Sequence, residues 1–333
     1  MIVVDADFLG RARTGDETYV RNLLRALPRV APDLRFAALT RRPDLVPDGV
    51  EPIHVPARLQ ELRMAVRLPL LLRRLRPELV HFVHALPPAL PCPGVLTVQD
   101  LSFERDASLM GLRETLTFRL TVRPSVRRAR RVFAISERTR ADLVELYGVR
   151  EEDVVVTPLA ADEAFVPGDA PREDYVLLVG SVEQRKRPLV AADAALACGR
   201  RLVVAGPERD PELVEELRRR GADLRGYVEQ DELVRLYQRA AVVLVPTSYE
   251  GFGLTVAEAM ACGAPVIAAP DPAVREVGGD AVAYAEPPEF SETLAAVLAD
   301  AEGRSAASLE RARAFSWERT AERTAAVYRE VLG

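Results

Sequence analysis

Lysine is almost absent from this sequence of 333 residues. One of the 45 basic residues is a lysine, Lys186, and the other 44 are arginines. A lysine ammonium is a compact point charge, whereas an arginine guanidinium is a planar fork. Lys186 is therefore a candidate for a site that needs a compact cation. The alternative is that this lysine is present by chance and has no special role.

Cysteine, long apolar runs and metal-ligand clusters are also scarce. The three cysteines, Cys92, Cys198 and Cys262, are odd in number, scattered and not at metal-binding spacing, which favours a reducing cytoplasm over a disulfide framework. No apolar run is long enough to span a bilayer. The chain opens on an apolar strand pattern at 2–4, so we expect no signal peptide. No structural or catalytic metal is expected.

Length and charge indicate two domains of different character. A chain of this length predicts about two domains. Residues 1–168 carry 25 basic and 22 acidic side chains (+3), and residues 169–333 carry 20 and 28 (−8), which sum to the net charge of −5. This asymmetry supports two domains with different neighbours.

Strand and helix patterns alternate along both halves, which predicts an α/β fold of two doubly wound parallel sheets. A linker rich in proline and glycine is expected at 160–172. We expect an N-terminal domain at 1–165, a second domain at 173–310 and a final helix at 311–333. The first half predicts strands at 2–5, 34–39, 53–55, 79–83, 94–98, 131–135 and 153–156, and helices near 16–28, 58–76, 110–130 and 137–147. The second half predicts strands at 175–180, 202–205, 223–226, 242–246, 265–268 and 282–284, with helices between them.

The rest of the sequence is organised around residues 246–263. An apolar strand pattern at 241–245 precedes this stretch, and a helix pattern follows Gly253. Gly251 and Gly253 therefore lie at a strand-to-helix turn, where the backbone approaches a ligand closely. The first amides of the helix lack intrahelical partners and lie at its positive dipole end. This turn predicts an anion site, most simply for phosphate.

Two carboxylates flank this turn, Glu250 before it and Glu258 one helical turn after it. A carboxylate that faces a sugar diol accepts two hydrogen bonds, so the pair suits sugar hydroxyls on either side of a phosphate. The alternative is a turn with two solvated glutamates. The stretch resembles the Glu-x7-Glu signature of the family-four retaining glycosyltransferases.

That resemblance implies the GT-B fold, two facing Rossmann-like domains with the site in the cleft between them. It implies that Glu258 holds the ribose of a nucleotide, and that Glu250 and the turn amides hold the donor sugar and diphosphate. The implied donor-binding residues of this stretch are Glu250, Gly251, Phe252, Gly253, Leu254 and Glu258.

A second part of the predicted donor site follows the strand at 175–180. Gly180 and Ser181 end this strand, and Arg185 and Lys186 precede a helix. The pair resembles the Arg-Lys pair with which the family grips the donor diphosphate, and a solvated basic loop is the alternative. The resemblance also places the nucleotide base at Tyr227 and Val228, through main-chain contacts that do not identify the base.

The first half departs from the family pattern at two places. Gly15 matches one glycine of a pair expected near the donor phosphates, but Glu17 stands where the second would be, and its charge would repel a diphosphate. The family commonly carries His-Asp after the fifth strand, where this chain has Gln99 and Asp100. A glutamine still donates and accepts hydrogen bonds but does not titrate near neutrality. Asp100 is a candidate for polarising the acceptor, and a turn cap is the alternative.

Two arginine-rich stretches, 58–76 and 119–131, form basic amphipathic patterns in the first half. Such helices rest on an anionic membrane or pack on their own sheet with a solvated face, and both interpretations stay open. His81 and His84 are three apart in a predicted strand, so they should not share a metal. Trp317, the only tryptophan, is interpreted as a packing anchor in the last helix.

The expected function is the metal-independent transfer of a hexose from a nucleotide diphosphate sugar to an acceptor hydroxyl, with the anomeric configuration retained. The resemblance implies no covalent nucleophile, since the donor phosphate can take the acceptor proton. The expected acceptor is a small molecule or a lipid-linked sugar, no cofactor or nucleic acid is involved, and peripheral membrane contact is possible. Sugar, base and acceptor are not specified by the sequence. The candidate catalytic residues are Arg185, Lys186, Glu250 and Asp100.

Two other classes of function stay open at this point. A non-catalytic nucleotide-sugar-binding subunit is supported by Gln99 and Glu17, while the intact Glu250, Glu258, Arg185 and Lys186 argue against it. The other class is a GT-B epimerase or phosphorylase. A dehydrogenase is not expected, because no Gly-x-Gly-x-x-Gly follows a strand.

Overall fold

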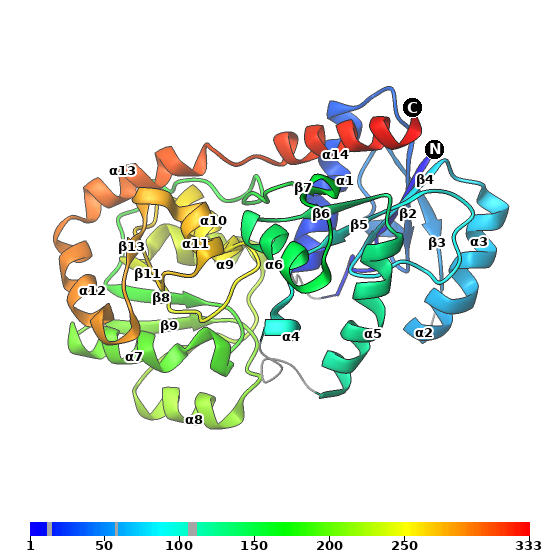
Figure 1. Ribbon diagram of the computed structural model, residues 1–333. Coiled ribbons are helices and arrows are strands. Elements are labelled where there is room, and N and C mark those ends of the chain that lie inside the picture. The colour runs from blue at the N-terminus through cyan, green and yellow to red at the C-terminus, as the bar shows by residue number, and fades with distance from the viewer. Residues whose placement is uncertain (12–14, 57–58, 106–111) are drawn as a thin grey trace. The chain divides into compact units, whose positions relative to one another are not determined.

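The computed structural model divides the chain into two compact units (Figure 1). It describes residues 1–11, 15–56, 59–105 and 112–333. The first unit comprises Met1–Leu159 together with Ser316–Gly333, and the second comprises Ala160–Phe315. The predicted fold class of two Rossmann-like parallel-sheet domains is confirmed.

The first unit is built on a seven-stranded parallel sheet of order β3-β2-β1-β4-β5-β6-β7. Its central strands are buried on both faces, as in parallel sheets covered by helices on each side, so their sequences are continuous apolar runs. The strands are β1 (Ile2–Asp5), β2 (Phe36–Thr40), β3 (Val50–His54), β4 (Leu79–Val83), β5 (Gly94–Val98), β6 (Arg131–Ala134) and β7 (Val154–Val156).

Helices of the first unit connect these strands, and the last helix of the chain also belongs to this unit. α14 packs against α1. Trp317 at the start of α14 is buried against Tyr19 of α1, with ring centroids 6.3 Å apart. The helices are α1 (Gly15–Val30), α2 (Gln60–Leu62), α3 (Leu68–Leu75), α4 (Ser102–Arg105), α5 (Leu112–Arg128), α6 (Glu137–Tyr147) and α14 (Trp317–Leu332).

The second unit contains a six-stranded parallel sheet of order β10-β9-β8-β11-β12-β13. β8 and β11 are neighbours, so the loops that follow them leave the same edge of the sheet. The strands are β8 (Tyr175–Val179), β9 (Arg201–Ala205), β10 (Asp223–Leu224), β11 (Val242–Val245), β12 (Val266–Ala268) and β13 (Ala283–Tyr284). The helices are α7 (Pro188–Ala197), α8 (Pro211–Arg219), α9 (Gln230–Arg239), α10 (Leu254–Ala261), α11 (Pro272–Gly278), α12 (Phe290–Ala299) and α13 (Ala301–Ala312).

The predicted single helix at 58–76 is wrong in detail. Arg58 lies outside the described residues, and the rest forms α2, a π-helical turn at Arg63–Arg67 and α3. The wider π turn rotates the helix faces, so that Arg63 is fully buried. The apolar residues at helical spacing in this stretch predict one apolar stripe along the helix, but they do not share one face, because Leu71 and Leu75 pack on the core and the others are exposed. The exposed members are Leu59 (63%), Leu62 (48%), Val66 (45%) and Leu70 (52%).

Candidate functional site

The turn between β11 and α10 has the backbone of an anion site. Gly253 adopts φ +101°, a left-handed conformation that favours glycine, and immediately precedes α10. Its carbonyl oxygen accepts the amides of Val256 and Ala257. Among the described residues, the amides of Leu254 and Thr255 have no hydrogen-bond partner. Two donors at the positive end of the helix are therefore available to an anion.

Lys186 reaches this turn from the loop after β8. Its Nζ donates to Oε1 of Glu250 at 2.5 Å, and both side chains are largely buried. Gly180 adopts φ +136°, a conformation that favours glycine, and the Lys186 side chain passes close to it, since a Cβ atom at Gly180 would lie 3.4 Å from the lysine Cε. Ser181 follows at the same strand end and is half-buried. The single lysine of the chain thus lies beside the first predicted carboxylate.

Arg185 binds the segment that leads into the same turn. Its Nη1 donates to the carbonyl oxygen of Tyr249 at 2.8 Å, and its Nη2 donates to Oε1 of Glu183 at 2.9 Å. A longer ion pair of 3.8 Å joins it to Glu250. Burial would raise the pKa of the Glu250 carboxyl, but the charges of Lys186 and Arg185 outweigh burial and hold this pKa below its ordinary range. Glu250 is therefore an ionised acceptor between two cations.

Glu258 has different surroundings. It is buried in α10, and its Oε2 accepts the hydroxyl of Tyr237 from α9 at 3.0 Å. Burial raises the pKa of the Glu258 carboxyl to about 8; the Tyr237 hydroxyl opposes the rise, and the nearby carboxylate of Asp162 adds to it. Asp162 is itself held by Nε2 of Gln230 at 2.9 Å. The two predicted carboxylates thus differ in charge state at neutral pH.

The predicted base-binding turn lies beside β9. The amide of Gly206, which follows β9, donates to the carbonyl oxygen of Gly226 at 2.8 Å. The side chain of Tyr227 is 44% exposed, and Val228 is half-buried. The predicted residues of the second unit are thus carried on loops that follow β8, β10 and β11.

The predicted residues of the first unit lie on α1 and after β5. Gly15 begins α1, and the preceding loop residues 12–14 lie outside the described residues. Glu17, which is expected to repel a diphosphate, is a buried carboxylate that accepts the amide of Gly10 at 3.0 Å and pairs with Arg21. Oδ1 of Asp100 accepts both the amide and the hydroxyl of Ser102, at 2.9 and 2.7 Å, which is the geometry of a turn cap.

Gln99 and His84 carry buried polar atoms at this edge of the first sheet. Among the described residues, Nε2 of Gln99 and Nδ1 of His84 have no hydrogen-bond partner. His84 has a left-handed backbone at φ +66°, and its Nε2 lies 2.9 Å from Oδ1 of Asp16. His81, by contrast, is fully buried between Tyr328 and Thr97. The two histidines share no partner, as their spacing predicts.

A buried charge network at the end of β1 was not predicted. Arg63 donates to both oxygens of Asp5 and lies 3.7 Å from Asp7. Asp7 also accepts two hydrogen bonds from Arg41, at 2.6 and 2.7 Å. The sequence signal was the pair of aspartates in an otherwise apolar strand end, since buried carboxylates require a cation.

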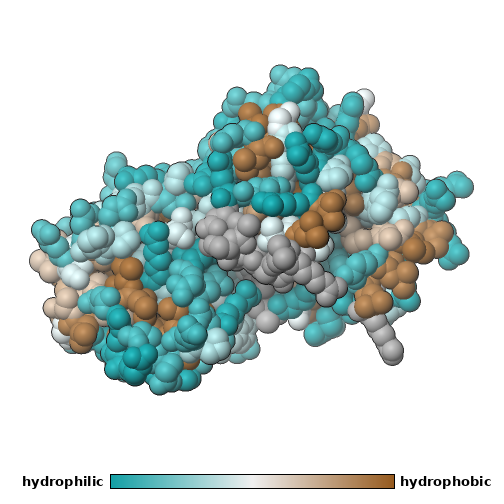
Figure 2. Space-filling model, turned by 60° about the horizontal axis from the view of Figure 1, so that its bottom comes forward, coloured by the Kyte–Doolittle hydropathy of each residue, from teal (hydrophilic) through white to brown (hydrophobic). Residues whose placement is uncertain are grey.

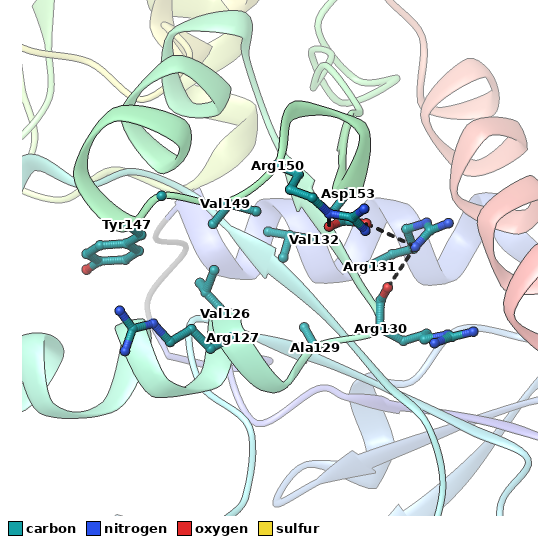
Figure 3. Close-up of a pocket in the computed structure, with 11 residues that line it drawn as sticks. Val126, Arg127, Ala129, Arg130, Arg131, Val132, Tyr147, Val149, Arg150 and Asp153 are labelled. Carbon is teal, nitrogen blue, oxygen red and sulfur yellow. Dashed lines mark hydrogen bonds and ion pairs between the residues drawn. The ribbon is translucent and has the colours of Figure 1, made fainter.

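A separate cavity of about 400 Å³ lies in the first unit, at the amino ends of β6 and β7 (Figure 3). Asp153 accepts from Arg131 and Arg150, as the dashed lines in Figure 3 show. α5 and α6 both end at this cavity, so its arginines compensate the negative ends of two helix dipoles. In parallel α/β sheets ligands bind at the opposite, carboxyl edge, so this cavity is not the predicted site.

Two family models match successive parts of the chain. Residues 13–165 match the model described as Glycosyltransferase Family 4, and residues 173–300 match the model described as Glycosyl transferases group 1. The chain is 30% identical over 231 residues to O-antigen chain mannosyltransferase B of Escherichia coli, a match covering 60% of this chain and 61% of that protein. It is 36% identical over 242 residues to a D-inositol 3-phosphate glycosyltransferase of Kribbella flavida, covering 61% and 57%. The chain thus spans about three fifths of the length of these relatives.

Solved structures share the fold over nearly the whole chain. Sucrose-phosphate synthase from Thermosynechococcus elongatus superposes with a TM-score of 0.78 at 20% identity, covering 99% of this chain and 98% of that one. An Anabaena protein, HepE, in complex with UDP and glucose gives 0.73 at 17% identity, covering 99% and 100%. WaaG, a glycosyltransferase involved in lipopolysaccharide biosynthesis, gives 0.73 at 18% identity, covering 98% and 99%. At these identities the likeness establishes the fold alone.

Proposed function

We propose that this chain is a GT-B glycosyltransferase that moves a hexose from a nucleotide diphosphate sugar to an acceptor hydroxyl, with the anomeric configuration retained. The two glycosyltransferase family models that match it and its fold support this proposal. The observation that carries the proposal is the convergence of Lys186, Arg185 and the start of α10 around Glu250. Two cations and two backbone amides that have no hydrogen-bond partner among the described residues therefore lie at one turn.

The difficult part of such a transfer is the departure of the diphosphate, which gains negative charge as the glycosidic bond breaks. Lys186, Arg185 and the amides of Leu254 and Thr255 supply fixed positive charge and donors at that position. Their charge is already oriented in the protein, so little reorganisation is required during the reaction. We therefore propose a metal-independent reaction in which these groups stabilise the leaving group.

The two glutamates take different parts of the donor. Glu250 is ionised and lies beside the cations, so we assign it to the hydroxyls of the transferred sugar, with the amides of 252–254 alongside. Glu258 is one helical turn further along α10 and is assigned to the nucleotide ribose. Gly180 and Ser181 shape the diphosphate loop, and Tyr227 and Val228 offer main-chain contacts to the base.

The acceptor side belongs to the first unit in this proposal. Oδ1 of Asp100 is engaged by Ser102, so Oδ2 is the atom assigned to polarising the acceptor hydroxyl. Gln99 is assigned to the donor sugar instead, to which it offers an amide donor that has no partner among the described residues. No covalent nucleophile is assigned, and the departing phosphate takes the acceptor proton.

We further propose that the first unit docks on an anionic membrane through an apolar ridge, defined as Leu59, Leu62, Val66 and Leu70. All four side chains are roughly half exposed or more, and Figure 2 shows apolar clusters standing among polar atoms on the surface. Exposed arginines of the same segment complement anionic headgroups; these are Arg67, Arg73, Arg74 and Arg76. None of the described helices is long and apolar enough to cross a bilayer.

Donor turnover tests the proposed function. The purified protein is incubated with ADP-, GDP-, UDP- and dTDP-hexoses, with and without EDTA, and release of the nucleoside diphosphate is followed. We expect slow hydrolysis of one donor that EDTA does not reduce, and a product whose anomeric proton retains the donor configuration. A protein that binds a donor without ever consuming it, with or without candidate acceptors, is a binding subunit, and the enzymatic proposal is then wrong.

A further inference from the structure

Glu258 is a buried carboxyl group, and in the part of the chain that the structure describes no cation pairs with it. Its Oε2 accepts the Tyr237 hydroxyl, and the charge that acts on this carboxyl is the carboxylate of Asp162. Cys262, at the end of the same helix, is the other titratable group nearby. Removing an ionised carboxyl from water without a cation is costly, so this side chain favours its protonated form.

A ribose diol changes this balance. The two hydroxyls donate hydrogen bonds, and a carboxylate accepts both, whereas a protonated carboxyl must use one oxygen as a donor. Hydrogen bonds to the charged form favour ionisation. The diol therefore binds best after the carboxyl has lost its proton to the solvent.

Tyr237 is placed to prepare the carboxyl for this change. Its ring is fully buried and packs edge-on against Phe165, with centroids 5.8 Å apart, so the hydroxyl is fixed. The hydroxyl donates to Oε2 and thereby stabilises the ionised form, while Asp162 opposes ionisation. The two neighbours thus act in opposite directions on the same group.

We propose that Tyr237 is a positioning residue that orients the Glu258 carboxyl toward a nucleotide ribose, and that binding of the ribose diol releases one proton from this carboxyl. This inference rests on the proposed function, because it takes the ligand of Glu258 to be a ribose. The proton goes to the buffer, and no bond of the donor is broken. Affinity for a nucleoside diphosphate therefore rises about tenfold per pH unit below pH 8 and levels off above it.

Calorimetric titration measures the proton directly. The probe is whichever of the ribonucleotides ADP, GDP and UDP binds the full-length protein, titrated at pH 7 in buffers of different ionisation enthalpy. Binding of dTDP alone would overturn the inference, because its deoxyribose has no diol. The matched control ligand is the 2′,3′-dideoxy form of the same nucleotide, which carries the same phosphates but no diol. We expect the ribonucleotide to release nearly one proton more than the dideoxy form.

Three variants distinguish a positioning role of the Tyr237 hydroxyl from a packing role of its ring. Tyr237→Phe keeps the ring and removes the hydroxyl, so the midpoint of the pH profile moves upward and binding at pH 7 weakens. Asp162→Asn removes the opposing charge and moves the midpoint downward. Tyr175→Phe is the control, since Tyr175 is also buried and its hydroxyl donates to the Leu236 carbonyl oxygen of the same helix α9, at 2.8 Å; it should leave the profile unchanged.

The outcomes distinguish the two proposals. Binding of the ribonucleotide without excess proton release, or identical pH profiles for Tyr237→Phe and Tyr175→Phe, overturns the inference and leaves the donor site standing. Failure of all four diphosphates to bind overturns the proposed function itself. Excess proton release with opposite midpoint shifts in Tyr237→Phe and Asp162→Asn supports both.

Discussion

The Nζ atom of Lys186 lies 2.5 Å from Oε1 of Glu250, although the two residues are 64 positions apart in the chain. The contact joins the loop after β8 to the loop after β11, and these strands are neighbours in the sheet. The charge of Lys186 helps to keep the Glu250 carboxylate ionised inside a largely buried environment. In the proposed reaction the positive charge of Lys186 also stabilises the leaving diphosphate.

Replacing Lys186 with alanine should reduce turnover by about 10²–10³-fold, the usual effect of losing one group that stabilises charge in the transition state. The change also leaves the Glu250 carboxylate without its closest cation, so stability must be measured in parallel by thermal unfolding. The double variant Lys186→Ala/Glu250→Gln removes the stranded charge and should recover stability without recovering turnover. Near-normal turnover in folded Lys186→Ala would exclude Lys186 from the site.

Stability should fall as pH rises from about 4.5 to 8 because of Glu258. The folded-state pKa of this carboxyl is about 8 against an ordinary 4.5, so the folded protein holds a proton that the unfolded chain has released over this window. The free energy of unfolding therefore decreases with rising pH, by an amount on the order of a few kcal/mol. Glu258→Gln removes this slope, and melting temperatures of both proteins from pH 5 to 8 check it. Parallel curves for the two proteins would mean that Glu258 is ionised throughout.

The ionisation of Glu250 makes stability rise with pH, opposite to the effect of Glu258, and it does so at lower pH. Its pKa is held below the ordinary 4.5 by Lys186 and Arg185, against the effect of burial. Its contribution to stability is therefore complete above pH 4.5 and is lost as pH falls through the lowered folded-state pKa. The stability difference between the native protein and Glu250→Gln should shrink in acid below pH 4.5, and a difference independent of pH would refute this ionisation.

Replacing Arg63 with methionine should destabilise the first unit by about 3–5 kcal/mol, because it leaves buried carboxylates without their cation. The double variant Arg63→Met/Asp5→Asn should be less affected. Arg73→Met, an exposed arginine of α3, is the matched control and should change stability by less than about 0.5 kcal/mol. Chemical denaturation measures all three, and equal stability of Arg63→Met and Arg73→Met would contradict the role of Asp5 and Asp7.

The apolar ridge should bind vesicles that contain phosphatidylglycerol and not vesicles of phosphatidylcholine alone. Leu62→Ser/Leu70→Ser should lose this binding in a sedimentation assay while keeping donor hydrolysis. Leu196→Ser in α7 is the control, since Leu196 is more exposed, at 65%, than Leu62 and Leu70, at 48% and 52%, but lies in the second unit. If both variants sediment with the anionic vesicles as the native protein does, the ridge is not the docking surface.

The sequence predicted most of the fold and the turn that carries the proposed donor site. Buried parallel strands are continuous apolar runs, so strands such as β1, β4 and β5 were located to the residue. The turn at Gly253 was predicted because consecutive residues form it. Its glycines and the helix pattern that follows them indicate the backbone conformation directly.

The surroundings of the glutamates could not be predicted in the same way. Tyr237 lies 21 positions from Glu258, and its hydroxyl reaches the carboxyl only because α9 packs on α10. Arg63 belongs to a basic amphipathic pattern whose arginines were expected to face solvent. A π-helical turn, which no residue pattern predicted, rotates the Arg63 side chain toward Asp5.

Nucleotide binding tests the central claim most directly. ADP, GDP, UDP and dTDP are titrated by calorimetry into the native protein and into Lys186→Ala/Glu258→Gln, whose fold is checked by circular dichroism. The account predicts that one diphosphate binds the native protein and that the double variant binds it at least about 100-fold more weakly, because each lost contact of this kind costs about a factor of ten or more. Equal affinity in the two proteins, or no binding of any diphosphate to the native one, would contradict it.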